Sequence, residues 1–191
     1  MNFTVKLAHS DQLEAAAEVL ADAFENSEWT RWIIPADGYR DRLFKLQLLY
    51  LTHAMDHGLV LVDNQLRAAA ALMPASAPDP SIALQEQMAA LHGDRLARLE
   101  AHPDSVPPFT ADWTLSTIGV KTEHQAQGLG SALLTAALHD FIPIGSSVTL
   151  ETSDAGNVRF YESFRFAVVD KFKPKEGPST FTMFREPRAA N

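Results

Sequence analysis

Residues 125–131, with the sequence QAQGLGS, have a composition suited to binding an anion through the main chain. Gly128 and Gly130 lack the Cβ atom that would hold a ligand away from the backbone. The segment lies between a predicted strand and a predicted helix, where unpaired N–H groups and the positive end of the helix dipole coincide. We therefore predict that it binds a phosphate or pyrophosphate group. The alternative is a tight strand-to-helix turn in which the glycines only permit close packing.

Two other phosphate-binding motifs do not fit this segment. The sequence has no Gly-Lys-Ser/Thr for a P-loop. A dinucleotide-binding fold would need a third glycine in the loop, and none is present. The predicted site thus relies on backbone amides and not on basic side chains.

Asn157 and Tyr161 are four residues apart in a predicted helix, so their side chains project from one face. A tyrosine hydroxyl held in a pocket can act as a general acid by donating its proton to a leaving thiolate. The alternative is a core tyrosine in an apolar stripe with Val158 and Phe164, because aromatic residues at helical spacing usually serve packing.

His53 and His57 stand at positions i and i+4 of a predicted helix, a spacing that can hold a metal ion. Ala54 occupies the position at which a metalloprotease helix carries its glutamate. The chain also contains no cysteine, which excludes thiolate ligands, disulfides and a cysteine nucleophile. We expect no metal site.

The composition and charge of the chain limit the classes of protein to which it can belong. Its 191 residues carry 16 Lys and Arg against 24 Asp and Glu, a formal net charge of −8. This balance argues against nucleic-acid binding, which depends on clustered basic side chains. No basic stretch followed by a long apolar run marks a signal peptide, and no apolar run is long enough to span a membrane. We expect a cytoplasmic, single-domain protein with neither a nucleic-acid nor a membrane partner.

The periodicity of apolar residues predicts an α/β chain. Alternating or short buried apolar runs predict strands over residues 3–8, 59–62, 67–73, 113–120, 148–152, 166–172 and 180–184. Helical spacing predicts a helix capped by Ser10, short helical pieces within 26–38, and helices over 40–57, 128–141 and 156–164. The strand–helix–strand order near the C-terminus implies at least one parallel pair of strands.

Residues 74–111 interrupt the strands with two proline-rich loops and further helices. Asp79 as cap and Pro80 as first helical residue are predicted to open one helix. Gly93 interrupts that helix, and a shorter one follows. We interpret the segment as a helical insertion within one domain of residues 1–191.

Two patterns combine into a recognisable whole: GV-x4-Q-x-Q-G-x-G-S-x-L-L from Gly119, and LETS-x3-N-x2-FYESF-x-F from Leu150. Together they resemble the GNAT superfamily of N-acetyltransferases, whose loop for acetyl-coenzyme A (acetyl-CoA) has the form Q/R-x-x-G-x-G/A. Within the superfamily, the chain is most similar to the puromycin N-acetyltransferases. The resemblance extends over nearly the whole chain and is strongest from Trp113 onward.

The resemblance implies a mixed, mostly antiparallel sheet with splayed central strands and helices on both faces. It implies acetyl-CoA as cosubstrate, without a metal ion, and Tyr161 as the catalytic acid. The residues implied to bind acetyl-CoA are Ile118, Gly119, Val120, Gln125, Ala126, Gln127, Gly128, Leu129, Gly130, Ser131, Asn157 and Tyr161.

The implied reaction is direct transfer of acetyl, in a ternary complex, to the primary amine of a small molecule, puromycin-like or another aromatic amine. Trp29, Trp32 and Tyr50 either line the pocket of this acceptor or cover the core, and residues 74–111 are expected to cover the acceptor side. The protein is expected to be a monomer or a homodimer. Alternatives are a protein N-terminal or lysine acetyltransferase and a non-catalytic CoA-binding sensor of the same fold.

A base must take the proton of the acceptor amine, and three carboxylates are candidates. Glu151 is preferred because it lies at the end of a predicted strand beside the cleft, while Asp112 and Glu123 are the alternatives. Each could instead be a solvated surface acid, and a chain of water molecules could take the proton.

One residue departs from the superfamily's pattern. Arg165 stands where a glycine usually ends the tyrosine-bearing helix in a left-handed turn. The substitution predicts local strain or a different helix cap, because side chains with a Cβ atom disfavour that conformation.

Overall fold

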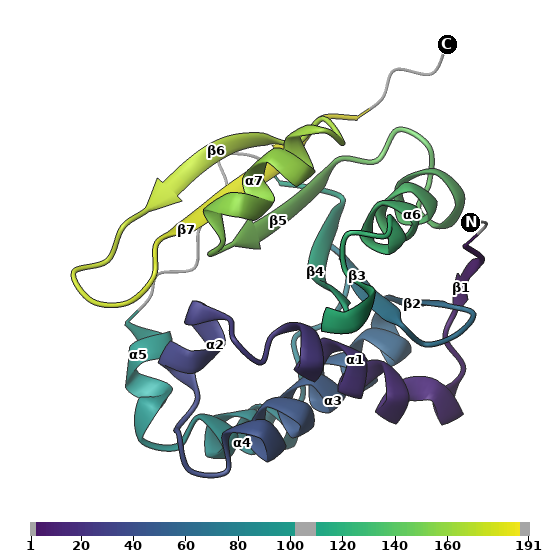
Figure 1. Ribbon diagram of the computed structural model, residues 1–191. Helices are drawn as coiled ribbons and strands as arrows, with labels where there is room; N and C mark the ends of the chain where they lie inside the picture. The colour runs from purple at the N-terminus through teal and green to yellow at the C-terminus, as the bar shows by residue number, and fades with distance from the viewer. Residues whose placement is uncertain (1–2, 102–109, 188–191) are drawn as a thin grey trace.

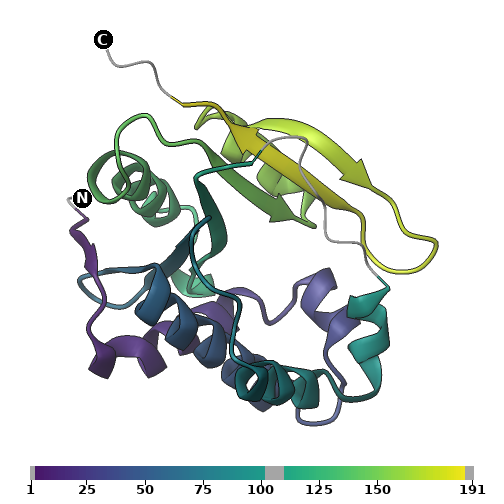
Figure 2. The same ribbon diagram turned by 180° about the vertical axis from the view of Figure 1, so that it is seen from behind.

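The computed structural model describes residues 3–101 and 110–187, and it contains a seven-stranded sheet with helices on both faces (Figures 1 and 2). The strand order is β1-β2-β3-β4-β5-β7-β6. Every pair of neighbours is antiparallel except β4 and β5, which are parallel. The predicted mixed, mostly antiparallel α/β architecture is confirmed.

The elements follow the order that the periodicity predicts. The strands are β1 Val5–Leu7, β2 Leu59–Asp63, β3 Ala68–Pro74, β4 Trp113–Val120, β5 Val148–Thr152, β6 Ala167–Phe172 and β7 Thr180–Arg185. The α-helices are α1 Leu13–Ala23, α2 Glu28–Ile33, α3 Tyr39–His57, α4 Ile82–His92, α5 Leu96–Glu100, α6 Leu129–Ala136 and α7 Ala155–Glu162. Shorter turns are η1 Ser10–Gln12, η2 Gly93–Arg95, η3 Thr122–His124 and the π-helical η4 Ala137–Phe141.

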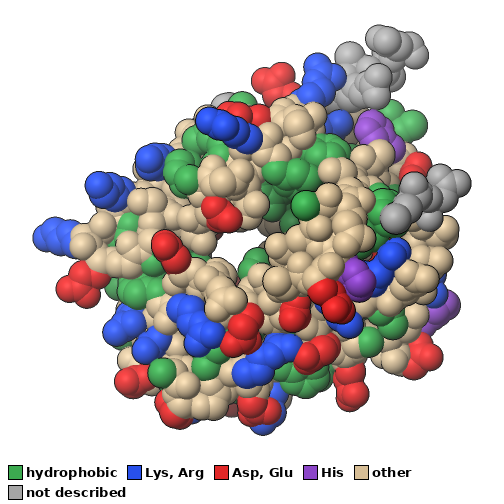
Figure 3. Space-filling model, viewed as in Figure 1, with side chains coloured by type: hydrophobic (Ala, Val, Ile, Leu, Met, Phe, Trp, Pro, Cys, Tyr) green, Lys and Arg blue, Asp and Glu red, His purple; other side chains and the backbone are tan. Residues whose placement is uncertain are grey.

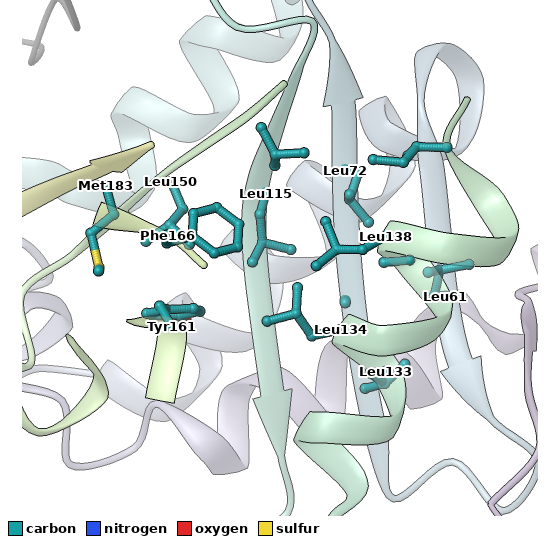
Figure 4. Close-up of a cluster of buried hydrophobic side chains, with 14 of the residues drawn as sticks. Leu61, Leu72, Leu115, Leu133, Leu134, Leu138, Leu150, Tyr161, Phe166 and Met183 are labelled. Carbon is teal, nitrogen blue, oxygen red and sulfur yellow. The ribbon is translucent and has the colours of Figure 1, made fainter. Parts of the chain in front are cut away.

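Strands β2 and β3 separate two apolar clusters, one on each face of the sheet, because successive side chains of a strand point to opposite faces. Leu61, Ala70 and Leu72 join the cluster formed with α6 and α7 (Figure 4). Their neighbours Val60 and Ala71 join the cluster formed with α1 and α3. The run of four buried alanines at 68–71 therefore allows helices to approach the sheet closely from both sides.

The two parallel strands at the centre of the sheet separate after three residue pairs. Trp113, Thr114 and Leu115 of β4 pair with β5, and beyond Leu115 the pairing stops. On the other side, β4 stays paired with β3 as far as Val120, with a bulge at Ser116, which has no partner on β3. One edge of the second half of β4 is consequently left without a strand neighbour, which is the predicted splay.

Two predicted helix caps are wrong, and one helix of the predicted extent changes type before its end. Ser10 is not a helix cap: it lies inside η1, where the Gln12 side chain accepts a hydrogen bond from the His9 amide. Helix α4 is capped by Ser81 and not by Asp79, because the Ser81 hydroxyl accepts from the Leu84 amide. The helix predicted over 128–141 is α-helical only as far as residue 136 and continues as a π-helical turn.

In the sequence, α4, η2 and α5 follow β3 and precede β4, and arginine side chains of η2 and α5 hold α2 in place. Arg95 donates to the Ile34 carbonyl at 2.6 Å, and Arg98 donates to the Trp32 carbonyl at 2.9 Å. These bonds satisfy carbonyl groups at the end of α2 that have no partner within the helix. Residues 102–109 of the predicted insertion lie outside the described residues. Among the helices of the described ranges, none is long and apolar enough to cross a membrane.

Candidate active site

The splay of β4 and β5 opens into a cleft of about 1480 Å³. Its walls come from both halves of the chain: β4, the glycine-rich loop and α7 on one side, and α2, α3 and the loop before α4 on the other. In the space-filling view an opening passes through the molecule (Figure 3). The cleft has room for two ligands that meet between the separated strands.

The glycine-rich loop presents a row of free backbone N–H groups to this cleft. The first hydrogen bond of α6 runs from the Ala132 amide to the Gly128 carbonyl at 2.9 Å. The six amides of residues 126–131 donate no hydrogen bond to any described residue. Gly128 is the N-cap residue of α6, so the positive end of the helix dipole coincides with these amides. The arrangement is suited to binding phosphate groups.

Side chains of the loop and of α1 fix the path of this segment. Gln125 donates through Nε2 to the Val120 carbonyl at 3.2 Å, and Gln127 donates to the Glu123 carbonyl at 3.3 Å. The carboxylate of Asp22, near the end of α1, accepts from the Thr122 amide at 2.6 Å. The two predicted glutamines thus brace the loop and leave ligand binding to the backbone.

The glycines of the motif are present for different reasons. Gly128 has φ +88°, a conformation that strains other residues, although a Cβ atom there would meet nothing closer than 3.6 Å. A Cβ atom at Gly130 would also have ordinary contacts, the closest at 3.7 Å, so internal packing does not require a glycine there. Gly119 differs, because a Cβ atom would lie 2.8 Å from the Ala23 side chain. Close packing therefore explains Gly119 but not the loop glycines.

Tyr161 is both a core residue and a wall of the cleft. Its ring packs against Phe160 and Phe166 at centroid distances of 5.1 and 6.0 Å, beside Leu150 and Met183 (Figure 4). The hydroxyl group makes no hydrogen bond to a described residue. Burial, together with the negative charge of Asp154, raises the pKa of the hydroxyl to about 12. The group therefore keeps its proton at neutral pH and can donate it.

Asn157 lies one helical turn before Tyr161 on α7 and also lines the cleft. Asp154 caps α7 by accepting from the Gly156 amide at 2.7 Å, which sets the start of the helix. The helix ends at Glu162, and the turn that follows it contains Arg165, whose φ is +69°. The predicted left-handed strain is confirmed.

The three candidate bases have different surroundings. Glu151, the next-to-last residue of β5, lines the cleft and accepts from the Thr182 hydroxyl at 3.4 Å. Asp112 does not line the cleft: hydrogen bonds from the Ser147 amide and hydroxyl, at 2.8 and 2.7 Å, hold the pKa of its carboxyl below the ordinary value. Glu123 is exposed beside His124 and also lies outside the cleft. Glu151 is thus the candidate that the fold brings to the site.

The three aromatic residues predicted for the acceptor side have separate positions. Trp29 and Tyr50 line the cleft, whereas Trp32 does not. Trp32 lies against the turn between β6 and β7, where a Cβ atom on Gly177 would come within 2.4 Å of its ring. Of the two alternatives for Trp32, covering the core is the one that the structure shows, because its ring packs against a buried cluster and under that turn.

Residues 106–186 match the family model described as the acetyltransferase (GNAT) domain. Over 100% of this chain and 99% of the other, the structure is similar to a histone acetyltransferase HPA2 and related acetyltransferase from Corynebacterium glutamicum, with a TM-score of 0.78 and 21% identity. The chain has the GNAT fold.

Two further structures with the GNAT fold differ in the acceptor that their names state. One is the ribosomal-protein-S18-alanine N-acetyltransferase from Escherichia coli, with a TM-score of 0.57, 18% identity and coverage of 100% and 97% of the two chains. The other is a Drosophila melanogaster polyamine N-acetyltransferase that forms N-acetylagmatine, with a TM-score of 0.61, 14% identity and coverage of 97% and 100%. One fold thus serves a protein and a polyamine, so the fold does not identify the acceptor.

Within the GNAT fold, the structure adds cleft residues that the sequence did not single out. Thr30 and Gln47 are buried polar side chains from α2 and α3 that line the cleft. A polar residue on an otherwise apolar face of the long helix is the signal that could have pointed to Gln47. His53 lines the cleft as well, with its ring 4.9 Å from that of His57. In the described ranges no group of three or more His, Asp or Glu side chains could hold a metal ion.

Proposed function

We propose that this protein is an acetyl-CoA-dependent N-acetyltransferase that acetylates the primary amine of a small molecule, puromycin-like or another aromatic amine. The observation that carries the proposal is that the residues lining one cleft include Ala126 and 128–131, whose amides donate to no described residue, together with Tyr161, whose hydroxyl is protonated. The amides suit the pyrophosphate of the cosubstrate, and the hydroxyl suits its leaving sulfur.

The residues present fit acetyl-CoA in a second respect. The second half of β4, which includes Ile118, Gly119 and Val120, has one edge without a strand partner. An extended ligand with amide groups, such as the pantetheine arm, can hydrogen-bond to such an edge as an added strand does. The arm and the pyrophosphate would then follow β4 and the loop in chain order. When bound, acetyl-CoA supplies an acetyl group activated as a thioester.

In this proposal two protons move at named atoms. The Glu151 carboxylate takes a proton from the acceptor amine, directly or through water, so that the nitrogen can attack. The Tyr161 hydroxyl gives its proton to the departing sulfur. Backbone N–H groups near Val120 orient and polarise the thioester carbonyl. The chain has no cysteine that could carry the acetyl group, which favours direct transfer in a ternary complex.

The acceptor side favours a small aromatic amine. Trp29 and Tyr50 offer ring surface, and the net charge of −8 favours a cation. The turn η2 and helix α5 of the insertion support the α2 wall through Arg95 and Arg98. We expect a pocket walled in this way to suit a small molecule better than a peptide chain. The closer resemblance to puromycin N-acetyltransferases stays a prediction.

A charge substitution at the loop tests the cosubstrate assignment. Ser131 is exposed in the first turn of α6, where a glutamate interacts favourably with the helix dipole. The Ser131→Glu protein should therefore keep its melting temperature, yet the added charge should repel the pyrophosphate and remove the rise in Tm that acetyl-CoA gives the wild type. Ser131→Gln, which is similar in size but neutral, should keep that rise. Equal shifts in all three proteins would refute the assignment.

Release of free thiol in the presence of acceptors then tests turnover. The proposal expects higher kcat/KM for aromatic α-amino amides than for spermidine, whose separated charges find no matching set of buried carboxylates among the cleft residues. Binding of acetyl-CoA without thiol release from any amine would favour the sensor alternative. Faster acetylation of lysine-bearing peptides would favour a protein acceptor.

A further inference from the structure

The side chain of Gln47 is buried in the wall of the cleft without the hydrogen bonds that a buried amide needs. It is 6% exposed, and its Oε1 atom has no partner in the part of the chain that the structure describes. Its Nε2 atom also donates to no described residue. A buried carbonyl oxygen left in this state destabilises the folded protein, because it loses its hydrogen bonds to water without replacement.

Gln47 differs in this respect from the other polar groups around it. The Thr30 hydroxyl, which also lines the cleft, is engaged by the Tyr39 hydroxyl at 2.7 Å and by the Phe24 carbonyl at 2.9 Å. Other buried atoms without a partner among the described residues belong to Glu25, Arg40 and His92, and none of these residues lines the cleft. Among the buried side-chain atoms of the described cleft walls, the one without a hydrogen-bond partner is therefore Oε1 of Gln47.

The surroundings of Gln47 place it on the acceptor side. It shares one face of α3 with Tyr50 and Ala54, three and seven residues later, and all three line the cleft. The α2 residues Trp29 and Ile33 line the same cleft. The glycine-rich loop and α7, which form the proposed acetyl-CoA side, belong to the other half of the chain. An amide among aromatic and aliphatic walls is the common composition of a site that selects one orientation of a small ligand.

We propose that Gln47 determines acceptor specificity by pairing with a carboxamide of the acceptor, so that the preferred substrate is an aromatic amine that also carries an uncharged amide. A carboxamide offers an N–H donor next to a C=O acceptor, and the glutamine amide offers the same two groups in return. This pairing satisfies Gln47 in either orientation of its amide. The inference rests on the proposed function, because it assigns a role within the acceptor side of that site.

The test compares two acceptors that differ in one group. Phenylalaninamide and phenylalanine methyl ester share the primary amine and the ring, but the ester has no N–H donor. The wild-type protein should acetylate the amide with a kcat/KM about 10- to 100-fold higher, because the ester has no N–H group for Gln47 Oε1 and leaves that oxygen unpaired. The Gln47→Met variant keeps a similar side-chain volume without the amide. It should lose most of the preference through a higher KM for phenylalaninamide, with little change for the ester.

Two controls separate this role from a structural one. The rise in Tm with acetyl-CoA should be the same in the Gln47→Met variant as in the wild type, since Gln47 lies outside the glycine-rich loop. Gln87→Met, an exposed position on α4 outside the cleft, should keep the amide preference. A Gln47→Met variant that slows both acceptors equally would show a structural role and would overturn the proposal.

A binding measurement keeps the inference testable if no thiol is released. In the presence of CoA, which carries no acetyl group, phenylalaninamide should raise the Tm of the wild type more than the ester does. The Gln47→Met variant should show no such difference. If the wild type acetylates neither acceptor, that result counts against the proposed function. If the amide and the ester shift the Tm of the wild type equally, or if neither shifts it, that result counts against the role of Gln47.

Discussion

The two halves of the cleft are built by different means. The side formed by β4, the glycine-rich loop and α7 offers backbone groups from nearby positions in the chain, with six free amides in residues 126–131. The side formed by α2, α3 and the loop before α4 offers side chains from segments far apart in the sequence, among them Trp29, Gln47 and Tyr50. The first side presents a nearly fixed array of donors, whereas substitutions of single side chains can alter the second.

Because of this difference, the first side can bind a common ligand while the second side selects a particular one. Backbone amides are present whatever the side chains are, so the loop needs only glycines and a helix start to bind phosphates. The acceptor wall can change at Gln47 or Trp29 without disturbing that loop. The variants below test this independence, in order of expected effect.

The largest expected effect is on kcat, at Tyr161. Tyr161→Phe removes the hydroxyl and leaves the ring contacts with Phe160 and Phe166. We expect kcat for thiol release to fall about 10²- to 10⁴-fold, because the leaving sulfur loses its acid, while the Tm shift with acetyl-CoA stays the same. A variant with full turnover would show that Tyr161 serves packing alone.

An intermediate effect, on stability, is expected where α2 contacts the hairpin of β6 and β7. Gly177→Ala places a Cβ atom against the Trp32 ring and strains a backbone with φ +93°. We expect a loss of stability of about 1–3 kcal/mol, measured by denaturant unfolding. Trp32→Ala should relieve the steric part, so the double variant should be more stable than the sum of the two single changes predicts. Simple additivity would mean that the contact is not tight.

The smallest effect is expected at the end of α7. Arg165→Gly removes the left-handed strain at φ +69°. We expect a gain of up to about 1 kcal/mol in the free energy of unfolding, because the relief of strain exceeds the flexibility that glycine adds to the unfolded chain. The kcat should not change. A loss of stability would show that contacts of the Arg165 side chain outweigh the strain.

The residues of the proposed acetyl-CoA side could be predicted to share one cleft because the patterns that mark them are local. The strand Trp113–Val120, the glycines at 128 and 130 and the Asn157–Tyr161 spacing are short-range patterns, and the structure places them all around one cleft. The helix caps were less predictable, since Ser81 and Asp79 are both good caps and only the backbone path decides between them.

The acceptor side could not be assembled in the same way. Trp29 and Trp32 are three residues apart on one short helix, yet one lines the cleft and the other packs under Gly177, which is 145 positions later in the chain. Likewise, the periodicity of α3 shows a polar residue on an apolar face at Gln47, but its burial without a partner for Oε1 among the described residues depends on how α3 packs against the rest of the fold. These outcomes depend on tertiary contacts that no local pattern encodes.

The opening that passes through the molecule has a kinetic consequence (Figure 3). Two reactants that arrive by separate mouths do not block each other, and neither has to leave before the other can enter. Initial rates measured over both concentrations should then give intersecting double-reciprocal lines, with no compulsory order of addition. One product could leave and be replaced by a new substrate while the other product stays bound at the other side. Turnover then need not wait until both products have left the cleft.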